Sequence, residues 1–361
     1  MRIWHVYASP RLGPVNGVVQ LMHHLADAQR AMGHEVEVLH GTDDDPRRSP
    51  TRGSARHLRS AVQDRATTSP PDVVHLHELF RPPHLTLLRV LRDVPYVVST
   101  HGATSPQNLG RYRVRKAAYG RLVEHRLVGG ARALVASTPV EAEELRRWHP
   151  APPPIRVLAN VADPALLGAP RWTPPPPGAP VVSLGRFDVR HKGLDRVSTV
   201  AKRLPGTTFA VHGGRCGNEP DLLDRLIAEK PANLQLLDAV SGPDKQAALR
   251  DAQAFILLSR WEGLSVALLE ALALGVPCVV SPEVAATLGP DAPVFVQRTD
   301  ASTQGRALAA FLADDGARRA LGARGRAWAE EHASPAAVGA ASIAIYDEAR
   351  RTDRRTLPAS A

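Results

Sequence analysis

The chain has 361 residues, of which 43% are hydrophobic and 22% charged, a composition typical of a soluble globular protein. This length favours two domains over a single hydrophobic core. The net charge of +9 suits an anionic partner, but aromatic residues make up only 4% of the chain, so base-stacking surfaces and a nucleic-acid partner are not expected.

The sequence argues against three further classes of protein. No uncharged apolar run reaches the roughly 18 residues that a membrane span needs, and the stretch MRIWHVYASPRLG has too few apolar residues for a signal peptide. The two cysteines, Cys216 and Cys278, are far apart and form neither a disulfide framework nor a CxxC metal site. We therefore expect a cytoplasmic protein, and its basic charge leaves a membrane surface open as a peripheral contact.

Strand and helix patterns alternate through the first half of the chain. A buried strand is followed by a turn, by a helical pattern that begins near Gly17 and ends at Gly33, and by a second strand, which makes one βαβ unit. Strands alternating with helices predict a parallel sheet that is covered on both faces. The expected strands of this half are 2–8, 34–40, 72–77, 95–102, 131–138 and 155–160.

The alternation restarts after a proline-rich stretch at 170–180, PRWTPPPPGAP, where we place the domain boundary. The expected strands of the second half are 181–186, 207–213, 233–239, 254–259, 276–281 and 293–297. The predicted fold class is therefore α/β, with two successive doubly wound, Rossmann-like domains. We predict an N-terminal domain at 1–169, a C-terminal domain at 170–335, a last helix at 336–350 and a flexible tail at 351–361.

Two loops of the first domain are candidates for ligand binding, because ligands of open parallel sheets lie beyond the carboxyl ends of the strands. The loop GPVNG at 13–17 contains Asn16 and Gly17, and its glycines either admit a phosphate or only make a tight turn. The loop THG at 100–102 contains His101, which either donates a hydrogen bond to a substrate oxygen or phosphate or is an ordinary loop histidine.

A third candidate loop, GRFDVRHKG at 185–193, follows the first strand of the second domain. Arg186 and Lys192 on this loop would together neutralise a diphosphate, with the arginine as a planar fork and the lysine as a point charge. Only five of the 45 cations in the chain are lysine, so a lysine at this position is informative. The alternative is a solvated loop that carries two charges.

A fourth candidate is the stretch EGLSVALLEALALG, in which Glu262 and Glu270 are separated by seven residues of a turn and an apolar helix. A helical spacing of about 12 Å exceeds the ~5 to 9.5 Å of a glycosidase carboxylate pair. The two acids instead suit separate hydroxyl groups of one ligand, and the backbone N–H groups at 263–266 suit an anion, which is the layout of a sugar nucleotide. Alternatively, Glu262 is only a helix-start charge and Glu270 pairs with an arginine.

The motifs and their order resemble the retaining GT-B glycosyltransferases of family four. The resemblance covers most of the chain, and its most specific part is EGLSVALLEALALGVPCVVS, which is similar to the E-x7-E signature of that family. It implies a GT-B fold of two Rossmann-like domains with a cleft between them, and a last helix that crosses back to the N-terminal domain. The other matching motifs are the glycine loop at 13–17, HLH at 75–77, THG at 100–102, VAST at 135–138 and GRFDVRHKGLD at 185–195.

The resemblance also implies roles for individual residues. Arg186 and Lys192 would bind the diphosphate, Glu262 the sugar hydroxyls and Glu270 the ribose, while His101 would contact the sugar. Further contacts to the donor are implied for Gly17 with its neighbour Asn16, for Gly263, Leu264 and Ser265, and, around the base, for Gly213 and Val240. The resemblance implies no metal and no cofactor, because the nucleotide diphosphate sugar, expected to be UDP-linked, is a co-substrate.

The implied activity is transfer of a sugar, with retention, to a hydroxyl of an acceptor such as a glycan, a lipid-linked sugar or a secondary metabolite. Acceptor recognition is expected between 103 and 130, where the basic segment 111–126 lies either at a membrane or anionic acceptor or simply in solvent. Two alternatives remain at this point: a nucleotide-sugar epimerase of the same fold and a non-catalytic partner that binds sugar nucleotides. The base, the sugar, the acceptor and the oligomeric state are left open.

Overall fold

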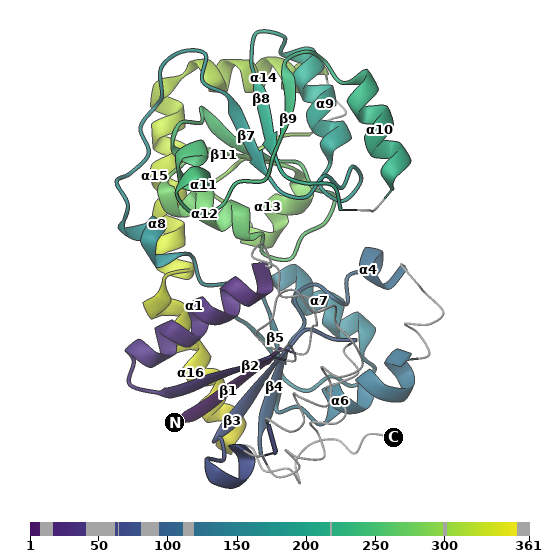
Figure 1. Cartoon of the computed structure of the whole chain (residues 1–361), viewed down its shortest axis with the longest axis vertical. Helices are drawn as coiled ribbons and strands as arrows, with labels where there is room; N and C mark the ends of the chain where they lie inside the picture. The colour runs from purple at the N-terminus through teal and green to yellow at the C-terminus, as the bar shows by residue number, and fades with distance from the viewer. Residues whose placement is uncertain are drawn as a thin grey trace. The chain divides into compact units, whose positions relative to one another are not determined.

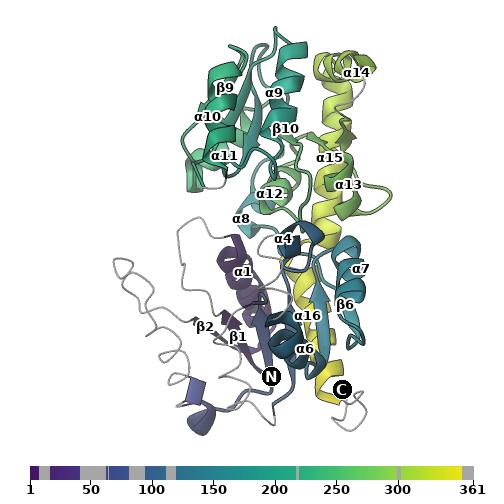
Figure 2. The same cartoon turned by 90° about the vertical axis from the view of Figure 1, so that its right-hand side faces the viewer.

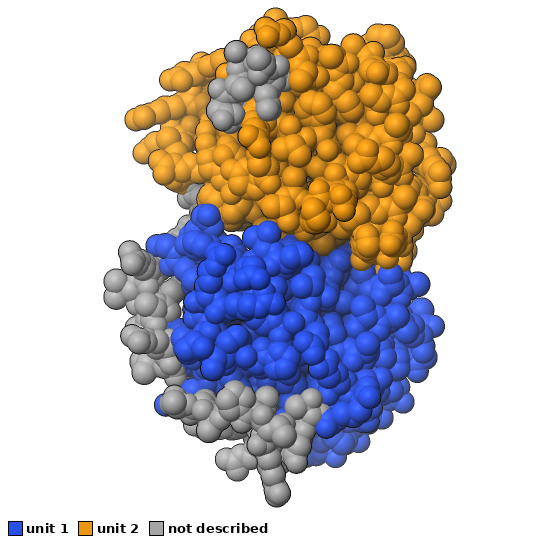
Figure 3. Space-filling model, turned by 180° about the vertical axis from the view of Figure 1, so that it is seen from behind, with its two compact units in different colours: residues 1–161, 335–361 blue, residues 162–334 orange. Residues whose placement is uncertain are grey.

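The computed structural model describes residues 1–7, 17–40, 62–63, 65–80, 94–110, 119–216, 219–298 and 302–351 (Figure 1). Asn16, the segment 111–118 and the predicted tail beyond 351 lie outside these residues. The chain divides into two compact units (Figure 3). Unit 1 contains residues 1–161 together with 335–361, and unit 2 contains residues 162–334.

Unit 1 is built on a six-stranded sheet in which all strands are parallel, in the order β2-β1-β3-β4-β5-β6. The six strands fall within the six ranges predicted from the sequence. The strands are β1 (Arg2–Tyr7), β2 (Glu35–His40), β3 (Val73–His77), β4 (Tyr96–Ser99), β5 (Ala133–Ala136) and β6 (Ile155–Val157).

Helices cover both faces of this sheet, as alternation of side chains along the strands requires. Ile3 packs in a cluster with residues of α1 (Gly17–Ala31) and α16 (Pro335–Arg351), and these two helices lie side by side (Figure 1). The next residue, Trp4, packs on the opposite face with residues of α6 (His125–Gly129) and α7 (Pro139–Trp148). The described part of the unit also contains α4 (Pro106–Gly110), a π-helix at Gly120–Glu124 and helical residues at 62–63 and 65–68.

Unit 2 repeats this architecture with a parallel sheet in the order β12-β11-β10-β7-β8-β9. Each strand again lies inside the range predicted for it. The strands are β7 (Val181–Leu184), β8 (Phe209–His212), β9 (Leu234–Leu237), β10 (Ala254–Leu257), β11 (Cys278–Val280) and β12 (Phe295–Val296). The two parallel sheets confirm the predicted α/β, Rossmann-like fold class.

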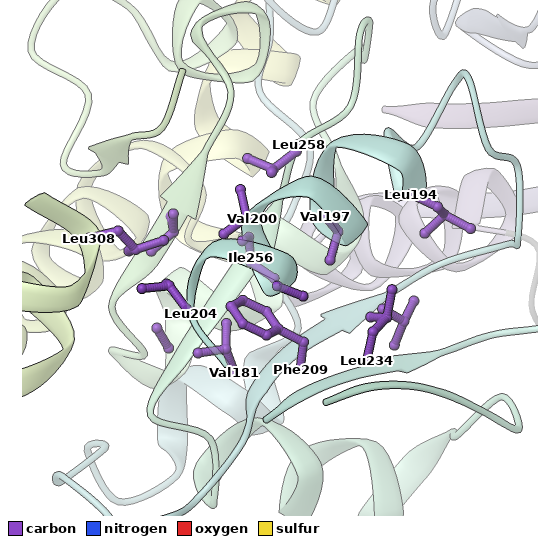
Figure 4. Close-up of a cluster of buried hydrophobic side chains, with 14 of the residues drawn as sticks. Val181, Leu194, Val197, Val200, Leu204, Phe209, Leu234, Ile256, Leu258 and Leu308 are labelled. Atoms are coloured by element: carbon purple, nitrogen blue, oxygen red, sulfur yellow. The ribbon is translucent and has the colours of Figure 1, made fainter. Parts of the chain in front are cut away.

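One face of this second sheet is covered by α9 (Leu194–Arg203), α10 (Pro220–Glu229) and α14 (Ser302–Ala313) (Figure 2). Their apolar side chains join strand residues such as Phe209 and Ile256 in one buried cluster (Figure 4). The helices α11 (Gly242–Arg250), α12 (Val266–Leu274) and α15 (Asp315–His332) pack with one another, and α12 and α15 also contact the strands. A short helix, α13 (Pro282–Leu288), follows β11.

The division between the units does not fall at the predicted 169/170. Helix α8 (Pro164–Gly168) packs on α12, and Arg326 of α15 donates hydrogen bonds to the carbonyls of Leu167 and Ala169. The proline-rich stretch is held in the same way, because the backbone N–H of Trp172 donates to the carbonyl of Leu274 at 2.9 Å. The stretch that suggested a linker is therefore a packed part of unit 2.

The predicted last helix, 336–350, corresponds to α16, which belongs to unit 1 although it follows unit 2 in the sequence. None of the helices in the described part of the chain has the length and apolarity of a membrane span.

Candidate functional site

The order of strands in unit 2 determines where a ligand fits. From β7 the chain winds outward through β8 and β9 on one side, and then returns to β10 on the other side of β7. Ligands of such sheets bind beyond the carboxyl ends of the strands at this switch point. The loops at this point follow β7 and β10. They contain two of the predicted motifs, GRFDVRHKG after β7 and the start of EGLSVALLEALALG after β10.

Glycine permits these loops to approach one another closely. Gly193 has φ +65°, and a Cβ atom there would lie 2.0 Å from the carbonyl oxygen of Leu258 at the end of β10. A Cβ atom on Gly213, after β8, would lie 1.9 Å from the carbonyl oxygen of Gly185. Side chains would keep the three strand ends apart, so these glycines set the geometry of the site.

The close approach places Lys192 against Glu262, seventy positions later in the chain. Lys192 Nζ lies 2.6 Å from Glu262 Oε1, and Ser259 Oγ donates to the same oxygen at 2.7 Å. The side chains of this ion pair are 17% and 9% exposed. Burial alone would raise the pKa of Glu262, but the charges of Lys192 and His191 and the two hydrogen bonds hold it below its ordinary value. Glu262 is therefore a carboxylate whose second oxygen, Oε2, remains available as an acceptor.

Two further groups of positive character belong to the same loops. The exposed Arg186 makes no ion pair or side-chain hydrogen bond with any described residue. Helix α12 begins directly after Gly263, Leu264 and Ser265, with neither an acid in its first turn nor a side-chain cap on its N-terminus. The uncapped start of a helix carries N–H groups and a partial positive charge that suit an anion.

Glu270 lies farther along α12 and is 3% exposed. Its carboxylate oxygen Oε1 lies 2.5 Å from Nζ of Lys245 on α11. This buried ion pair gives Glu270 a lysine partner that the sequence did not indicate. Val240, half-buried, lies in the loop between β9 and α11, at the same edge of the sheet as Gly213.

Three further side chains of this region were not predicted from the sequence. The rings of His191 and Trp261 stack with centroids 4.6 Å apart and planes 4° apart, and His191 Nε2 lies 3.9 Å from Glu262 Oε1. Lys245 was also missed, because only the fold brings it to a glutamate 25 residues later. Its residue type could have marked it as a candidate, since lysine is rare in this chain.

In unit 1 the corresponding switch point lies between β1 and β3, which are neighbours in the sheet. Gly17 begins α1 after β1, and His101 follows β4 with φ +48°, an unfavourable backbone conformation for a residue other than glycine. Among the described residues, the predicted donor-binding residues therefore fall into two groups, Gly17 and His101 in unit 1 and the others in unit 2.

A buried carboxylate holds His101 in this conformation. Glu141 Oε1 accepts hydrogen bonds from Thr100 Oγ1 and from the backbone N–H of Gly102, both at 2.5 Å. Its other oxygen accepts from the backbone N–H and the hydroxyl of Ser137, at 2.7 and 2.6 Å. Glu141 thus fixes both neighbours of His101. A Thr-x-x-Glu pattern at 138–141 was the signal for it, since Thr138 caps α7.

Three buried histidines of the sheet could be taken for a metal site. The ligand atoms of His5, His75 and His77 lie within 4.8 Å of one another. The rings of His75 and His77 are stacked, with centroids 4.1 Å apart and planes 27° apart, so their lone pairs run side by side instead of converging on a tetrahedral ion. Each ring nitrogen of the three residues also has a hydrogen-bond partner. The cluster therefore fits a hydrogen-bonded network better than a metal.

A cavity of about 30 Å³ lies beside this network, lined by His75, His77 and His101 together with residues of α1, β5 and α16. A volume of this size holds about one or two waters. It is too small for a sugar.

Comparison with known proteins identifies the two halves of the chain separately. Residues 15–166 match the model of Glycosyltransferase Family 4, and residues 173–328 match the model of Glycosyl transferases group 1. A curated relative, the GDP-mannose:cellobiosyl-diphosphopolyprenol alpha-mannosyltransferase of Xanthomonas oryzae pv. oryzae, is 31% identical over 274 residues, 72% of this chain. The match covers 66% of that relative, and a protein of the same name from Xanthomonas campestris, 29% identical, is covered to 64%.

Solved structures share the fold over almost the whole chain. Sucrose-phosphate synthase from Thermosynechococcus elongatus superposes with a TM-score of 0.75 at 17% identity, covering 96% of this chain and 98% of that one. HepE from Anabaena, solved in complex with UDP-glucose, gives a TM-score of 0.70 at 12% identity, with 95% and 99% covered.

The hydrogen bonds that Glu141 accepts from the residues around His101 give a first prediction. Glu141→Gln would leave one acceptor oxygen for the four donors and turn an amide NH₂ toward the others, so we expect a loss of about 3 kcal/mol in the free energy of unfolding. Urea unfolding measures this loss. Glu143→Gln on the same helix is the control, because Glu143 is 57% exposed, and it should change stability by less than about 0.5 kcal/mol. Equal stability of the two variants would contradict the role of Glu141.

The buried imidazoles give a second prediction. Burial lowers the pKa of His5 to about 4, although its hydrogen bond with Gln29 opposes the shift. The unfolded chain therefore binds a proton between pH 6.5 and 4 that the folded chain does not, and stability falls as the pH drops through this window. The contribution of His5 to this loss is about 2 kcal/mol between pH 7.5 and pH 5.

The comparison that checks this value is His5→Gln, which retains a donor and an acceptor but does not titrate. Its free energy of unfolding, from urea titrations at both pH values, should depend less on pH than that of the wild type by the same amount. An identical pH dependence in the two proteins would show that His5 is not held neutral.

Proposed function

Because the chain belongs to the GT-B glycosyltransferases, we propose that it transfers a glycosyl group from a nucleoside diphosphate sugar to a hydroxyl of an acceptor, with retention of configuration. The observation that carries the proposal is the ion pair of Lys192 and Glu262 at the switch point of the second sheet. A cation for the leaving group and an acid for the sugar hydroxyls lie within one hydrogen bond of each other.

The diphosphate of the donor is assigned to the positive groups of this edge. Lys192 is partly neutralised by Glu262 without a ligand, whereas Arg186 has no such partner among the described residues. A diphosphate would draw Lys192 toward itself, take the fork of Arg186 and accept from the N–H groups at the start of α12. These fixed charges stabilise the negative charge that develops on the leaving group.

The sugar and the ribose are assigned to the two acids of the E-x7-E motif. Oε2 of Glu262 accepts from hydroxyls of the sugar while Oε1 stays with Ser259. Glu270 accepts from the ribose hydroxyls, and its ion pair with Lys245 holds the carboxylate in place for that role. The stacked rings of His191 and Trp261 form an apolar wall beside Glu262.

In the proposed reaction a bond forms between the acceptor oxygen and the anomeric carbon. The bond from that carbon to the diphosphate oxygen breaks, and the hydroxyl proton passes to the departing phosphate oxygen. The products are the glycoside and the nucleoside diphosphate. His101 contacts a substrate hydroxyl from unit 1.

The names of the relatives indicate which donors to test first. The sequence-based expectation is a UDP-linked sugar, and HepE was solved with UDP-glucose. The two Xanthomonas relatives, however, are named for GDP-mannose and for a diphosphopolyprenol-linked acceptor, at much higher identity. We therefore propose GDP-mannose as the first donor and a lipid-linked saccharide as the first acceptor class.

Single substitutions at the ion pair test the proposed catalytic groups. Lys192→Met and Glu262→Gln should each lower the rate of nucleoside diphosphate release in the presence of acceptor by about 100-fold or more, since each removes a charge directed at the transition state. Lys202→Met and Glu229→Gln change the same residue types at exposed sites of unit 2, and they should retain full turnover. Unchanged turnover in both ion-pair variants would contradict the assignment.

A screen of nucleotides by thermal shift identifies the base independently of the acceptor. A nucleoside diphosphate at about 100 times its dissociation constant stabilises the protein by ~2.7 kcal/mol. GDP and UDP, each with and without the sugar, are the ligands to compare. Stabilisation by neither nucleotide would count against donor binding altogether.

A further inference from the structure

A chain of hydrogen bonds connects α16 to His101 through the interior of unit 1. It begins at the carbonyl of Gly339, which accepts from Ser342 Oγ at 2.7 Å. Ser342 Oγ in turn accepts from Gln29 Nε2 on α1 at 2.9 Å, and Gln29 Oε1 lies 2.8 Å from His5 Nε2. All of these side chains are completely buried.

The chain continues through imidazole rings to the loop after β4. His5 Nδ1 lies 2.9 Å from His77 Nε2, and His77 Nδ1 lies 3.0 Å from His101 Nε2. His77 is 2% exposed. Nδ1 of His101 makes no hydrogen bond with any described residue, and it is the outer end of the chain.

The direction of every proton in this chain follows from its inner end. The single proton of Ser342 goes to the Gly339 carbonyl, so Ser342 must accept from the amide nitrogen of Gln29, and the amide oxygen must face His5. His5 therefore carries its proton on Nε2 and accepts at Nδ1. The same rule makes His77 protonated on Nε2 and an acceptor at Nδ1, which requires a proton on Nε2 of His101.

These proton positions require that each imidazole is neutral and carries one proton, and burial favours that state. The pKa of His5 is lowered to about 4 by burial. Burial also lowers the pKa of His101, although the carboxylates of Glu141 and Glu78 act in the opposite direction. Neutral forms of His5 and His101 are thus the stable ones near pH 8.

We propose that the chain Ser342–Gln29–His5–His77 fixes His101 in the tautomer with its proton on Nε2, so that Nδ1 faces the substrate as a hydrogen-bond acceptor. Gln29 is then a positioning residue that acts through two other rings. On the proposed function, His101 accepts a hydrogen bond from a substrate hydroxyl and does not donate one to a phosphate, which reverses the role expected from the sequence.

A second branch of the network provides an internal control. His75 lies 2.6 Å from Tyr346 OH through Nδ1 and 2.7 Å from Ser99 Oγ through Nε2. None of its hydrogen bonds reaches His101. Loss of the Ser99 hydroxyl should therefore alter the resonances of His75 and leave the tautomer of His101 unchanged.

Nitrogen-15 NMR of histidine-labelled protein at pH 8 tests the proposal without any substrate, so its result is independent of the transfer reaction. The resonances of His101 are identified by their loss in His101→Gln. In the wild type, His101 should show a protonated Nε2 and an unprotonated Nδ1. A proton on Nδ1, or on both nitrogens, would overturn the proposal.

Variants of Gln29 test its role as the inner anchor. In Gln29→Leu, His5 loses the acceptor for its Nε2 proton. A buried N–H without a partner is costlier than a buried lone pair, so each histidine from His5 to His101 is expected to move its proton to Nδ1. The fraction of His101 protonated on Nδ1 should then rise from about a tenth or less to about half or more. Gln29→Glu, which keeps an acceptor, and Ser99→Ala should both retain the wild-type tautomer.

Other results with the Gln29 variants and with a chelator also test the role of the hydrogen-bond chain. A folded Gln29→Leu protein with the wild-type tautomer would remove Gln29 from the mechanism. If Gln29→Leu does not fold, Ser342→Ala combined with Tyr346→Phe removes both hydroxyl acceptors of the Gln29 amide, which can then rotate and should produce a mixture of both tautomers. A change in the resonances of His5, His75 and His77 on adding a chelator would identify the cluster as a metal site and would overturn the hydrogen-bonded chain.

Discussion

A carboxylate buried in a protein is stable only when charges and hydrogen bonds replace the water it has lost, and this constraint determines the site of unit 2. Glu262 is held by Lys192 and Ser259, which belong to loops after two neighbouring strands. The pair therefore joins the two loops before any ligand arrives. It also places a cation and a hydrogen-bond acceptor at the switch point of the sheet, where a crevice lies beyond the carboxyl ends of the strands.

The same constraint operates in unit 1, with a different result. Glu141 takes four hydrogen bonds from the residues around it and leaves none of its oxygens for a ligand. Its role is to hold Thr100 and Gly102, and through them the positive φ of His101. Among the described residues, only one oxygen of Glu262 is engaged, whereas both oxygens of Glu141 hold the loop that contains His101.

The strands could be predicted because a parallel strand covered on both faces appears as a short run of β-branched residues, such as VVSLGR or AFILLS. Lys192 and Glu262 were identified as candidates from the sequence. Their direct pairing could not be predicted, because it depends on the order of the strands and on the close approach of two loops at Gly193. The histidine chain was missed because His5 and His77 come within hydrogen-bonding distance only through the pairing of β1 with β3. The compact units divide at 161/162, a few residues before the predicted boundary, because the prolines that suggest a linker pack on unit 2.

A crystal structure with a bound nucleoside diphosphate tests the central claim most directly. The account predicts that the diphosphate lies against Arg186, Lys192 and the first turn of α12, with Lys192 Nζ drawn away from Glu262 and Glu262 free to bind the sugar. A diphosphate bound elsewhere, with the Lys192–Glu262 distance unchanged at 2.6 Å, would contradict it.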